Sequence, residues 1–118
     1  MNPYLAIDHI QLAMPPNGED RAREFYVAIL GMTEIEKPEE LRRNGGCWFA
    51  SGDVQIHLGV EHDFAPARKA HPALACADYD GLLAHLRSLG IVVTEQDLPD
   101  RKRAFIADLF GNRIELVG

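Results

Sequence analysis

The chain consists of two similar halves. Two stretches carry apolar residues at the i, i+3, i+4, i+7 spacing of an amphipathic helix, and a glycine follows each of them, Gly31 and Gly90. These glycines lie 59 residues apart, which is half of the 118-residue chain. Because an internal repeat means that each half folds as a module of the same kind, this spacing limits the chain to architectures built from two equivalent modules.

Each half repeats one order of elements. A short strand-like run precedes the helix and three more follow it, the last two joined by a turn that contains glycine. The expected elements are a strand over Ile7–Met14, a helix over Ala22–Leu30 and strands over Met32–Glu36, Cys47–Ala50 and Val54–Val60, then a strand over His71–Ala77, a helix over Tyr79–Leu89 and strands over Ile91–Glu95, Arg103–Ala107 and Arg113–Val117.

The fold class is therefore α+β, with two tandem βαβββ modules forming a curled mixed sheet around a central cavity. The modules cover about residues 1–60 and 71–118, with a polar linker over 61–70, within a single domain. The Gly45–Gly46 pair and the stretch Asp100–Lys102 are expected to be loops.

Composition excludes several classes of protein. Eighteen acidic and twelve basic residues give a net charge of −6, which argues against nucleic acid or an anionic membrane as the partner. Two cysteines are too few for a disulfide framework, so we expect free structural thiols and a cytoplasmic location. We expect neither a signal peptide nor a membrane span, because no apolar run is long enough to cross a bilayer.

Strand alternation separates candidate functional residues from the core. In the first, fourth and eighth strands the aliphatic residues share one face, which we expect to pack against the helices, and the opposite face carries His9, His57 and Glu115. Under the repeat His9 corresponds to His71, and His57 corresponds to Glu115. Ionisable groups are costly to bury without partners, and one shared metal accounts for all four. Three imidazoles and one carboxylate suit a divalent ion of zinc, nickel, iron, manganese or cobalt.

Three sequence motifs carry a resemblance to a known family. They are Ile7–Ile10 at the start of the first module, Ala22–Tyr26 with Leu30–Gly31 on the first helix, and Asp108–Leu116 near the end, where Leu109 replaces the usual proline of an Asp-Pro-x-Gly-Asn signature. Over essentially its whole length the chain resembles the vicinal oxygen chelate superfamily. That superfamily contains glyoxalase I, fosfomycin-modifying enzymes, methylmalonyl-CoA epimerase, extradiol dioxygenases and bleomycin-resistance proteins.

The resemblance implies a metal centre and a type of chemistry. The family's ligand positions map onto His9, His57, His71 and Glu115. Glyoxalase I and the epimerase have Glu or Gln where this chain has His57, whereas fosfomycin-modifying enzymes and extradiol dioxygenases use only the other three positions. The metal would chelate neighbouring substrate oxygens as a Lewis acid, so the resemblance favours a metal-dependent enzyme of lyase or isomerase type on a small oxygen-rich substrate.

Two roles are open for His57, which with Glu115 forms the candidate catalytic pair. Since Glu115 is the only carboxylate of the four, a metal-bound Glu115 leaves His57 as the candidate base for proton removal. If His57 instead binds the metal tightly, no evident base remains for removing the proton. A three-ligand centre with open positions would favour an extradiol-type dioxygenase or a transferase.

The contents of the site and its assembly are open as well. A metal-free binding protein, similar to bleomycin-resistance proteins, and a fold used only for protein interaction both fit the sequence. The resemblance implies a homodimer of a glyoxalase-like domain, with the ligands meeting within one chain or across the interface. The candidate substrate-pocket residues are Gln11, Trp48, Gln55, Arg103 and Phe105. Aromatic residues in strands are more often core, and a solvated loop is the more common role for Arg103 and its basic neighbours.

Overall fold

The computed structural model describes residues 1–118 and divides the chain into two compact units, residues 1–64 and 65–118. The boundary falls inside the expected linker over 61–70. Each unit has the expected α+β composition, with one four-stranded mixed sheet and its helices. No helix of the structure combines the length and the apolar character needed to cross a bilayer.

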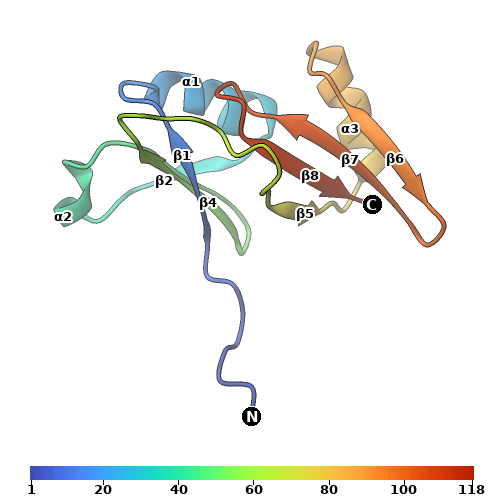
Figure 1. The fold of residues 1–118 in the computed structure, drawn as a ribbon, viewed down its shortest axis with the longest axis horizontal. Coiled ribbons are helices and arrows are strands. Elements are labelled where there is room, and N and C mark those ends of the chain that lie inside the picture. Colours follow the sequence, from blue (N-terminus) through green and yellow to red (C-terminus); the bar gives the residue numbers. More distant parts are fainter. The chain divides into compact units, whose positions relative to one another are not determined.

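Unit 1 is built around a sheet in the order β1-β4-β3-β2 (Figure 1). Strand β1 runs parallel to β4, and the other neighbouring strands are antiparallel. Its elements are β1 (Ile10–Met14), α1 (Glu19–Arg23), the π-helix η1 (Glu24–Ile29), β2 (Thr33–Ile35), α2 (Glu39–Arg42), β3 (Cys47–Ser51) and β4 (Val54–Val60).

Unit 2 repeats this topology with the order β5-β8-β7-β6. Strand β5 is parallel to β8, and the remaining pairs are antiparallel. Its elements are β5 (Ala73–Ala75), α3 (Tyr79–Ser88), β6 (Thr94–Leu98), β7 (Arg101–Ala107) and β8 (Arg113–Val117). The repeat inferred from the sequence is therefore present in the strand order of both units.

The apolar face of each sheet packs beneath the unit's own helix. In unit 1 the rings of Tyr26 in η1 and Phe49 in β3 stack with centroids 5.2 Å apart. In unit 2 the α3 residues Leu83 and Leu86 are buried, as are alternate apolar residues of β7 and β8. The buried strand residues are Met14, Cys47, Phe49, Ile56 and Leu58 in unit 1 and Ala104, Ile106, Ile114 and Leu116 in unit 2. Burying these side chains is the main stabilising term for both units.

The first helix widens into a π-helix halfway along. The amide of Leu30 donates to the carbonyl oxygen of Phe25, five residues earlier. A wider helix brings successive side chains closer in direction, so the consecutive residues Phe25 and Tyr26 are both fully buried. The helical periodicity predicts this helix but not its change of pitch.

Several boundaries differ from the sequence-based expectation. Strand β6 lies three residues later than expected, and Asp100–Lys102 is not a loop throughout, because β7 begins at Arg101. The reason is the pairing of Leu98 with Arg101, which leaves a two-residue turn between the strands. The one-turn helix α2 was not expected.

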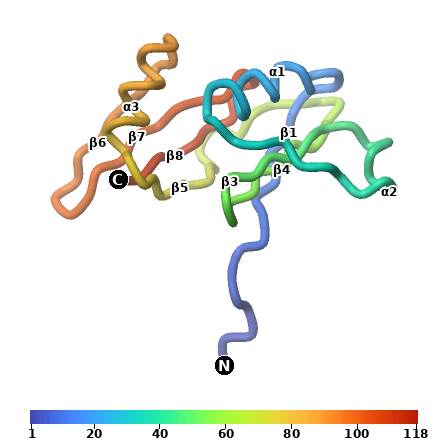
Figure 2. The backbone as a smooth tube through the Cα atoms, turned by 180° about the vertical axis from the view of Figure 1, so that it is seen from behind, coloured from blue at the N-terminus to red at the C-terminus, as the bar shows by residue number.

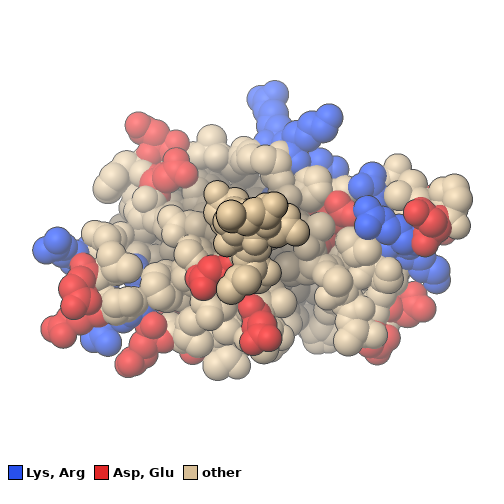
Figure 3. Space-filling model, turned by 90° about the horizontal axis from the view of Figure 1, so that it is seen from below, with Lys and Arg blue, Asp and Glu red and all other residues tan.

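Strand β1 starts at Ile10 rather than Ile7. The preceding segment, residues 1–8, leaves the sheet as an extended chain in both views (Figures 1 and 2). Its apolar side chains Tyr4, Leu5 and Ile7 are exposed. Figure 3 looks along this segment at the molecule, and the face seen there carries both acidic and basic side chains.

The turn between β7 and β8 is closed by one buried carboxylate. Asp108 Oδ1 accepts hydrogen bonds from the amides of Phe110 and Asn112, and Asp108 Oδ2 accepts from Asn112 Nδ2, each at 2.9 Å. Gly111 has a φ of +93°, which disfavours a side chain at this position. The family-like motif over Asp108–Asn112 thus sets where β8 begins.

We predict that Asp108→Ala lowers the free energy of unfolding by about 2–4 kcal/mol, because it leaves buried donors without an acceptor. Urea denaturation followed by circular dichroism measures this change. Asp53→Ala, in the exposed turn between β3 and β4, is the matched control and should cost less than about 0.5 kcal/mol. An equal loss of unfolding free energy in the two variants would show that the Asp108 hydrogen bonds do not stabilise the turn.

Candidate functional site

In unit 1 the two predicted ligands lie in a stack of three rings. His57 in β4 sits between His9 and Trp48, with ring centroids 4.0 Å and 3.9 Å away and planes inclined by 13° and 6°. Trp48 is opposite His57 on β3, and His9 directly precedes β1. The structure therefore brings His9 and His57 together and assigns Trp48 to their face of the sheet rather than to the core beneath the helix.

Hydrogen bonds orient both histidines of this stack. His9 Nδ1 donates to Asp8 Oδ2 at 2.8 Å, which leaves Nε2 without a proton when the ring is neutral. His57 Nε2 donates to Gln55 Oε1 at 3.0 Å. A carboxylate or amide oxygen behind an imidazole is the usual second layer of a metal site, since it fixes the tautomer and the ring orientation.

Burial keeps the central ring neutral. His57 is only 4% exposed. Desolvation lowers the pKa of His57 below its ordinary value, and the nearby His9 lowers it further. A neutral imidazole is the form needed both for metal binding and for accepting a proton.

Two of the predicted pocket residues line one small cavity of unit 1. This cavity of about 230 Å³ lies over β1, β3 and β4, and its walls include Gln11, Trp48 and Lys37. The absence of a side chain at Gly59 makes room for Gln11, because a Cβ there would lie 2.6 Å from Gln11 Nε2. Gln55 does not line this cavity, since it serves as the hydrogen-bond partner of His57.

In unit 2 the other two predicted ligands form a direct contact. His71 Nε2 lies 2.9 Å from Glu115 Oε1, and Glu115 is 4% exposed. The other ring nitrogen, Nδ1, lies 2.7 Å from the carbonyl oxygen of Lys69 and must carry a proton, because a carbonyl only accepts. A neutral ring would then turn a lone pair toward a carboxylate. The contact requires a cation between the two atoms, either a proton or a metal ion.

Arg103 and Phe105 complete the surroundings of this pair. Arg103 Nη1 lies 3.6 Å from Glu115 Oε1, and its Nε and Nη2 donate to Gln96 Oε1 at 2.9 and 2.6 Å. The ring of Phe105 meets that of His71 edge to face, with centroids 5.2 Å apart. Both residues therefore lie on the same face of the unit 2 sheet as His71 and Glu115, and their place in a substrate pocket stays a prediction.

The donor pair of unit 2 has a separation that fits a divalent metal. Neighbouring ligands bonded at about 2.1 Å and at right angles are about 3.0 Å apart, close to the His71–Glu115 separation. Each unit contributes two of the four predicted ligands, and in neither do three or more His, Cys, Asp or Glu side chains gather. The joining of the two pairs into one centre stays a prediction.

Sequence reasoning missed three contributors to these sites. Asp8 is adjacent to His9 in sequence, so its role could have been suspected from the pair alone. The carbonyl of Lys69 gives no sequence signal. Arg113 shares a face of β8 with Glu115, two residues away; the strand alternation places it on that face but assigns it no role.

Two tandem βαβββ modules, each with an ionisable pair on its open sheet face, define a class of protein, and the comparisons with known proteins agree. The chain belongs to the glyoxalase/bleomycin resistance protein/dioxygenase superfamily, whose model matches residues 6–116. This confirms the resemblance to the vicinal oxygen chelate proteins. None of the curated proteins compared with the chain matches it.

Solved structures of this family share the fold. A glyoxalase family protein from Bacillus anthracis is 46% identical, with a TM-score of 0.96 over 99% of this chain and 97% of that one. A lactoylglutathione lyase from Agrobacterium tumefaciens is 21% identical, with a TM-score of 0.73 and coverages of 98% and 94%. TnmS3, an antibiotic binding protein from Streptomyces sp. CB03234, is 24% identical, with a TM-score of 0.73 and coverages of 97% and 98%.

Both cysteines are free, and the environment of Cys47 makes it unreactive. Cys47 is 2% exposed, and burial raises its pKa to about 11. Cys76 is partly exposed, and burial also raises its pKa. Neither thiol has the lowered pKa of a nucleophile.

We predict that Cys47 of the folded protein reacts with Ellman's reagent at pH 8 at least about 100-fold more slowly than in urea, because two pKa units correspond to that loss of thiolate. Absorbance of the released thionitrobenzoate measures the rate. The Cys76→Ser variant isolates the Cys47 signal, and Cys47→Ser isolates that of Cys76. Rapid reaction of Cys47 in the folded Cys76→Ser variant would contradict the structural role.

Proposed function

We propose that this protein is a divalent-metal-dependent enzyme acting on a small oxygen-rich substrate, with lyase or isomerase chemistry. The observation that carries the proposal is the buried contact between His71 Nε2 and Glu115 Oε1. With His71 Nδ1 committed to a carbonyl, this contact needs a cation, and an imidazole nitrogen with a carboxylate oxygen is a common donor pair for first-row metals.

We propose that His9, His71 and Glu115 hold the ion, within one chain or across a homodimer, with His57 either as the fourth ligand or as the catalytic base. In support, each pair has its own orienting hydrogen bonds: Asp8 and Gln55 behind the unit 1 histidines, and the Lys69 carbonyl behind His71. Zinc, nickel, iron, manganese and cobalt are all compatible with such donors.

The bound metal would act as a Lewis acid that stabilises negative charge developing on neighbouring substrate oxygens. Glu115, buried beside His71, is suited to stay with the metal throughout. His57 is the proposed base: burial disfavours its charged form, and it takes the carbon-bound proton of the substrate on its free ring nitrogen. Gln11 and Trp48 would form part of the substrate's enclosure.

We predict that protein purified without added metal contains about one first-row metal ion per chain. Glu115→Gln and His71→Ala should lose it, because each removes one member of the pair that needs the cation. Inductively coupled plasma mass spectrometry measures the metal content. His62→Ala, which replaces an exposed histidine in the linker, is the matched control and should retain the metal.

Two results of this experiment decide between versions of the proposal. If the His57→Ala variant retains the metal, the ion has three ligands, His9, His71 and Glu115, and His57 is free to act as the base. Absence of metal from the unmutated protein, together with no uptake from added zinc, nickel, iron, manganese or cobalt, would exclude the metalloenzyme.

The reaction type is tested separately in the metal-loaded protein. Lyase or isomerase chemistry exchanges the carbon-bound proton of a small 2-hydroxy ketone with deuterated water, which proton NMR detects, and His57→Ala should abolish the exchange while keeping the metal. Consumption of dioxygen with a catechol, without proton exchange, would instead support the dioxygenase alternative.

A metal-free ligand-binding protein is the second candidate, favoured by the three-ring stack of His9, His57 and Trp48. Stacked aromatic faces can bind a planar ligand without any chemistry. One solved relative is named as an antibiotic binding protein. This candidate predicts no metal in the purified protein and no effect of Glu115→Gln on ligand binding.

A further inference from the structure

Strand alternation in unit 2 puts charged residues and apolar residues on opposite faces. The residues buried with α3 are Ala104, Ile106, Ile114 and Leu116. The other face carries Arg103, Phe105, Arg113 and Glu115. This second face therefore holds two guanidinium groups next to the carboxylate of the proposed metal centre.

The two arginines differ in their hydrogen-bond and ion-pair partners. Arg103 donates twice to Gln96 and lies 3.6 Å from Glu115. Arg113 is half-buried, and the structure gives it neither a hydrogen bond nor an ion pair. It stacks instead on Phe105, whose ring centroid lies 4.0 Å from the guanidinium carbon.

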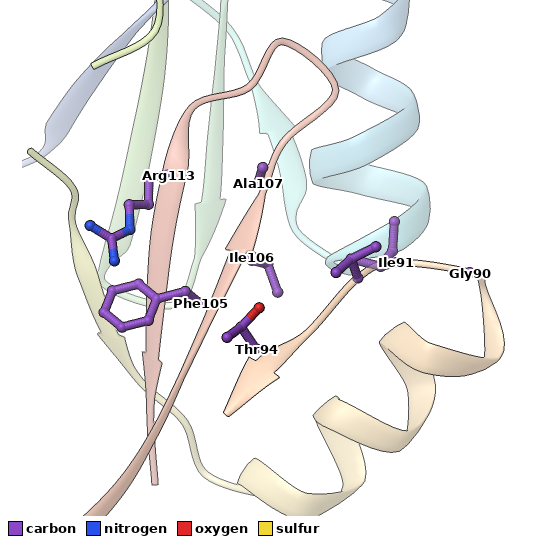
Figure 4. Close-up of a pocket in the computed structure, with 8 residues that line it drawn as sticks. Gly90, Ile91, Thr94, Phe105, Ile106, Ala107 and Arg113 are labelled. Carbon is purple, nitrogen blue, oxygen red and sulfur yellow. The ribbon is translucent and has the colours of Figure 1, made fainter. Parts of the chain in front are cut away.

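Phe105 holds this guanidinium in a defined position. In the close-up, the Arg113 head group lies over the Phe105 ring, on the side of the sheet away from α3 (Figure 4). The two residues, with Thr94, help to line a depression of about 420 Å³. Stacking on an aromatic ring uses the face of a guanidinium and leaves its in-plane N–H donors available.

A half-buried guanidinium with free donors is suited to an oxyanion. Its planar fork matches a carboxylate or a phosphate with two parallel hydrogen bonds. Arg113 and Glu115 are two residues apart on β8, a separation of about 7 Å along a strand. An anionic group at Arg113 would therefore belong to a small molecule whose other oxygens reach Glu115 and its metal.

We propose that Arg113, supported by the ring of Phe105, binds a carboxylate or phosphate-type group of the substrate, so that the substrate is a small organic anion. The proposal rests on the proposed function for the location of the reacting oxygens. The binding of the anion itself depends only on unit 2.

The test uses sodium benzoate and inorganic phosphate as probes of the protein as purified. ¹⁵N–¹H NMR follows the Arg113 side-chain Nε–H in the unmutated protein, and the backbone amides of β7 and β8 report binding in the unmutated protein and in every variant. One probe or both should shift these signals with a millimolar dissociation constant. Arg113→Gln should raise that constant at least about tenfold, and Arg113→Lys by less, because lysine keeps the charge but not the fork. Arg101→Gln, which replaces an exposed arginine of β7, is the matched control and should leave the constant unchanged within about twofold.

Each outcome bears on the proposal. Response to benzoate alone indicates a carboxylate, and response to phosphate alone indicates a phosphoryl group. An unmoved Arg113 signal with both probes up to about 50 mM overturns the proposal in the unmutated protein, even if the variants fail to fold. Undiminished binding in Arg113→Gln overturns it as well, since the anion would then be bound elsewhere.

Metal content separates this proposal from the proposed function. Arg113→Gln should keep the metal that Glu115→Gln loses, while binding the probes more weakly. Unmutated protein that neither contains nor takes up metal, but whose Arg113 signal still responds to the probes, would refute the metalloenzyme and leave the anion site standing. If Arg113→Gln lowers the midpoint of urea denaturation but leaves the binding of the probes unchanged, Arg113 stabilises the fold and does not bind the anion.

Discussion

The two-residue period of the β-strands is the constraint on which both sites depend. In β8, Ile114 and Leu116 pack with α3, and Arg113 and Glu115 therefore point to the other face. A slip of one residue would put a carboxylate and a guanidinium under the helix and expose two aliphatic side chains. The position of β8 follows from the turn closed by Asp108, so a residue with no part in the chemistry fixes the direction in which Glu115 points.

The two units use one scaffold for different chemistry. In each pair one candidate ligand lies just before an edge strand, His9 directly before β1 and His71 two residues before β5, and the other lies in the neighbouring parallel strand. In unit 1 the result is a stack of neutral or weakly basic rings around the buried His57. In unit 2 the result is an ionic contact, with Glu115 between His71 and Arg103. The equivalent positions His57 and Glu115 thus carry an imidazole in unit 1 and a carboxylate in unit 2.

The sequence predicts most of the fold, because helices and strands follow from periodicity. It names the four candidate ligands, but not that His9 lies against His57 and His71 against Glu115. Strands β4 and β8 match their expected bounds, since each alternates clearly and is bounded by a turn. Contacts with partners decide the rest. Strand β6 is displaced by its register with β7, and the π-helix and the one-turn α2 have no periodic signal. The roles of Trp48 and Arg113 depend on cross-strand neighbours, His57 and Phe105, and this information is absent from either segment alone.

The order in which contacts form during folding also follows from this topology. The β7–β8 turn closes within five residues, whereas the parallel pairs join residues far apart in sequence, such as Ile10 with Ile56 and Leu74 with Leu116. Closing the long loops costs more chain entropy than closing the short turn. The hairpins are therefore the local, early units, and the edge strands are added to them. His9 and His71 accompany those edge strands, so fraying of an edge would separate each ligand pair while the helix-covered core stayed folded.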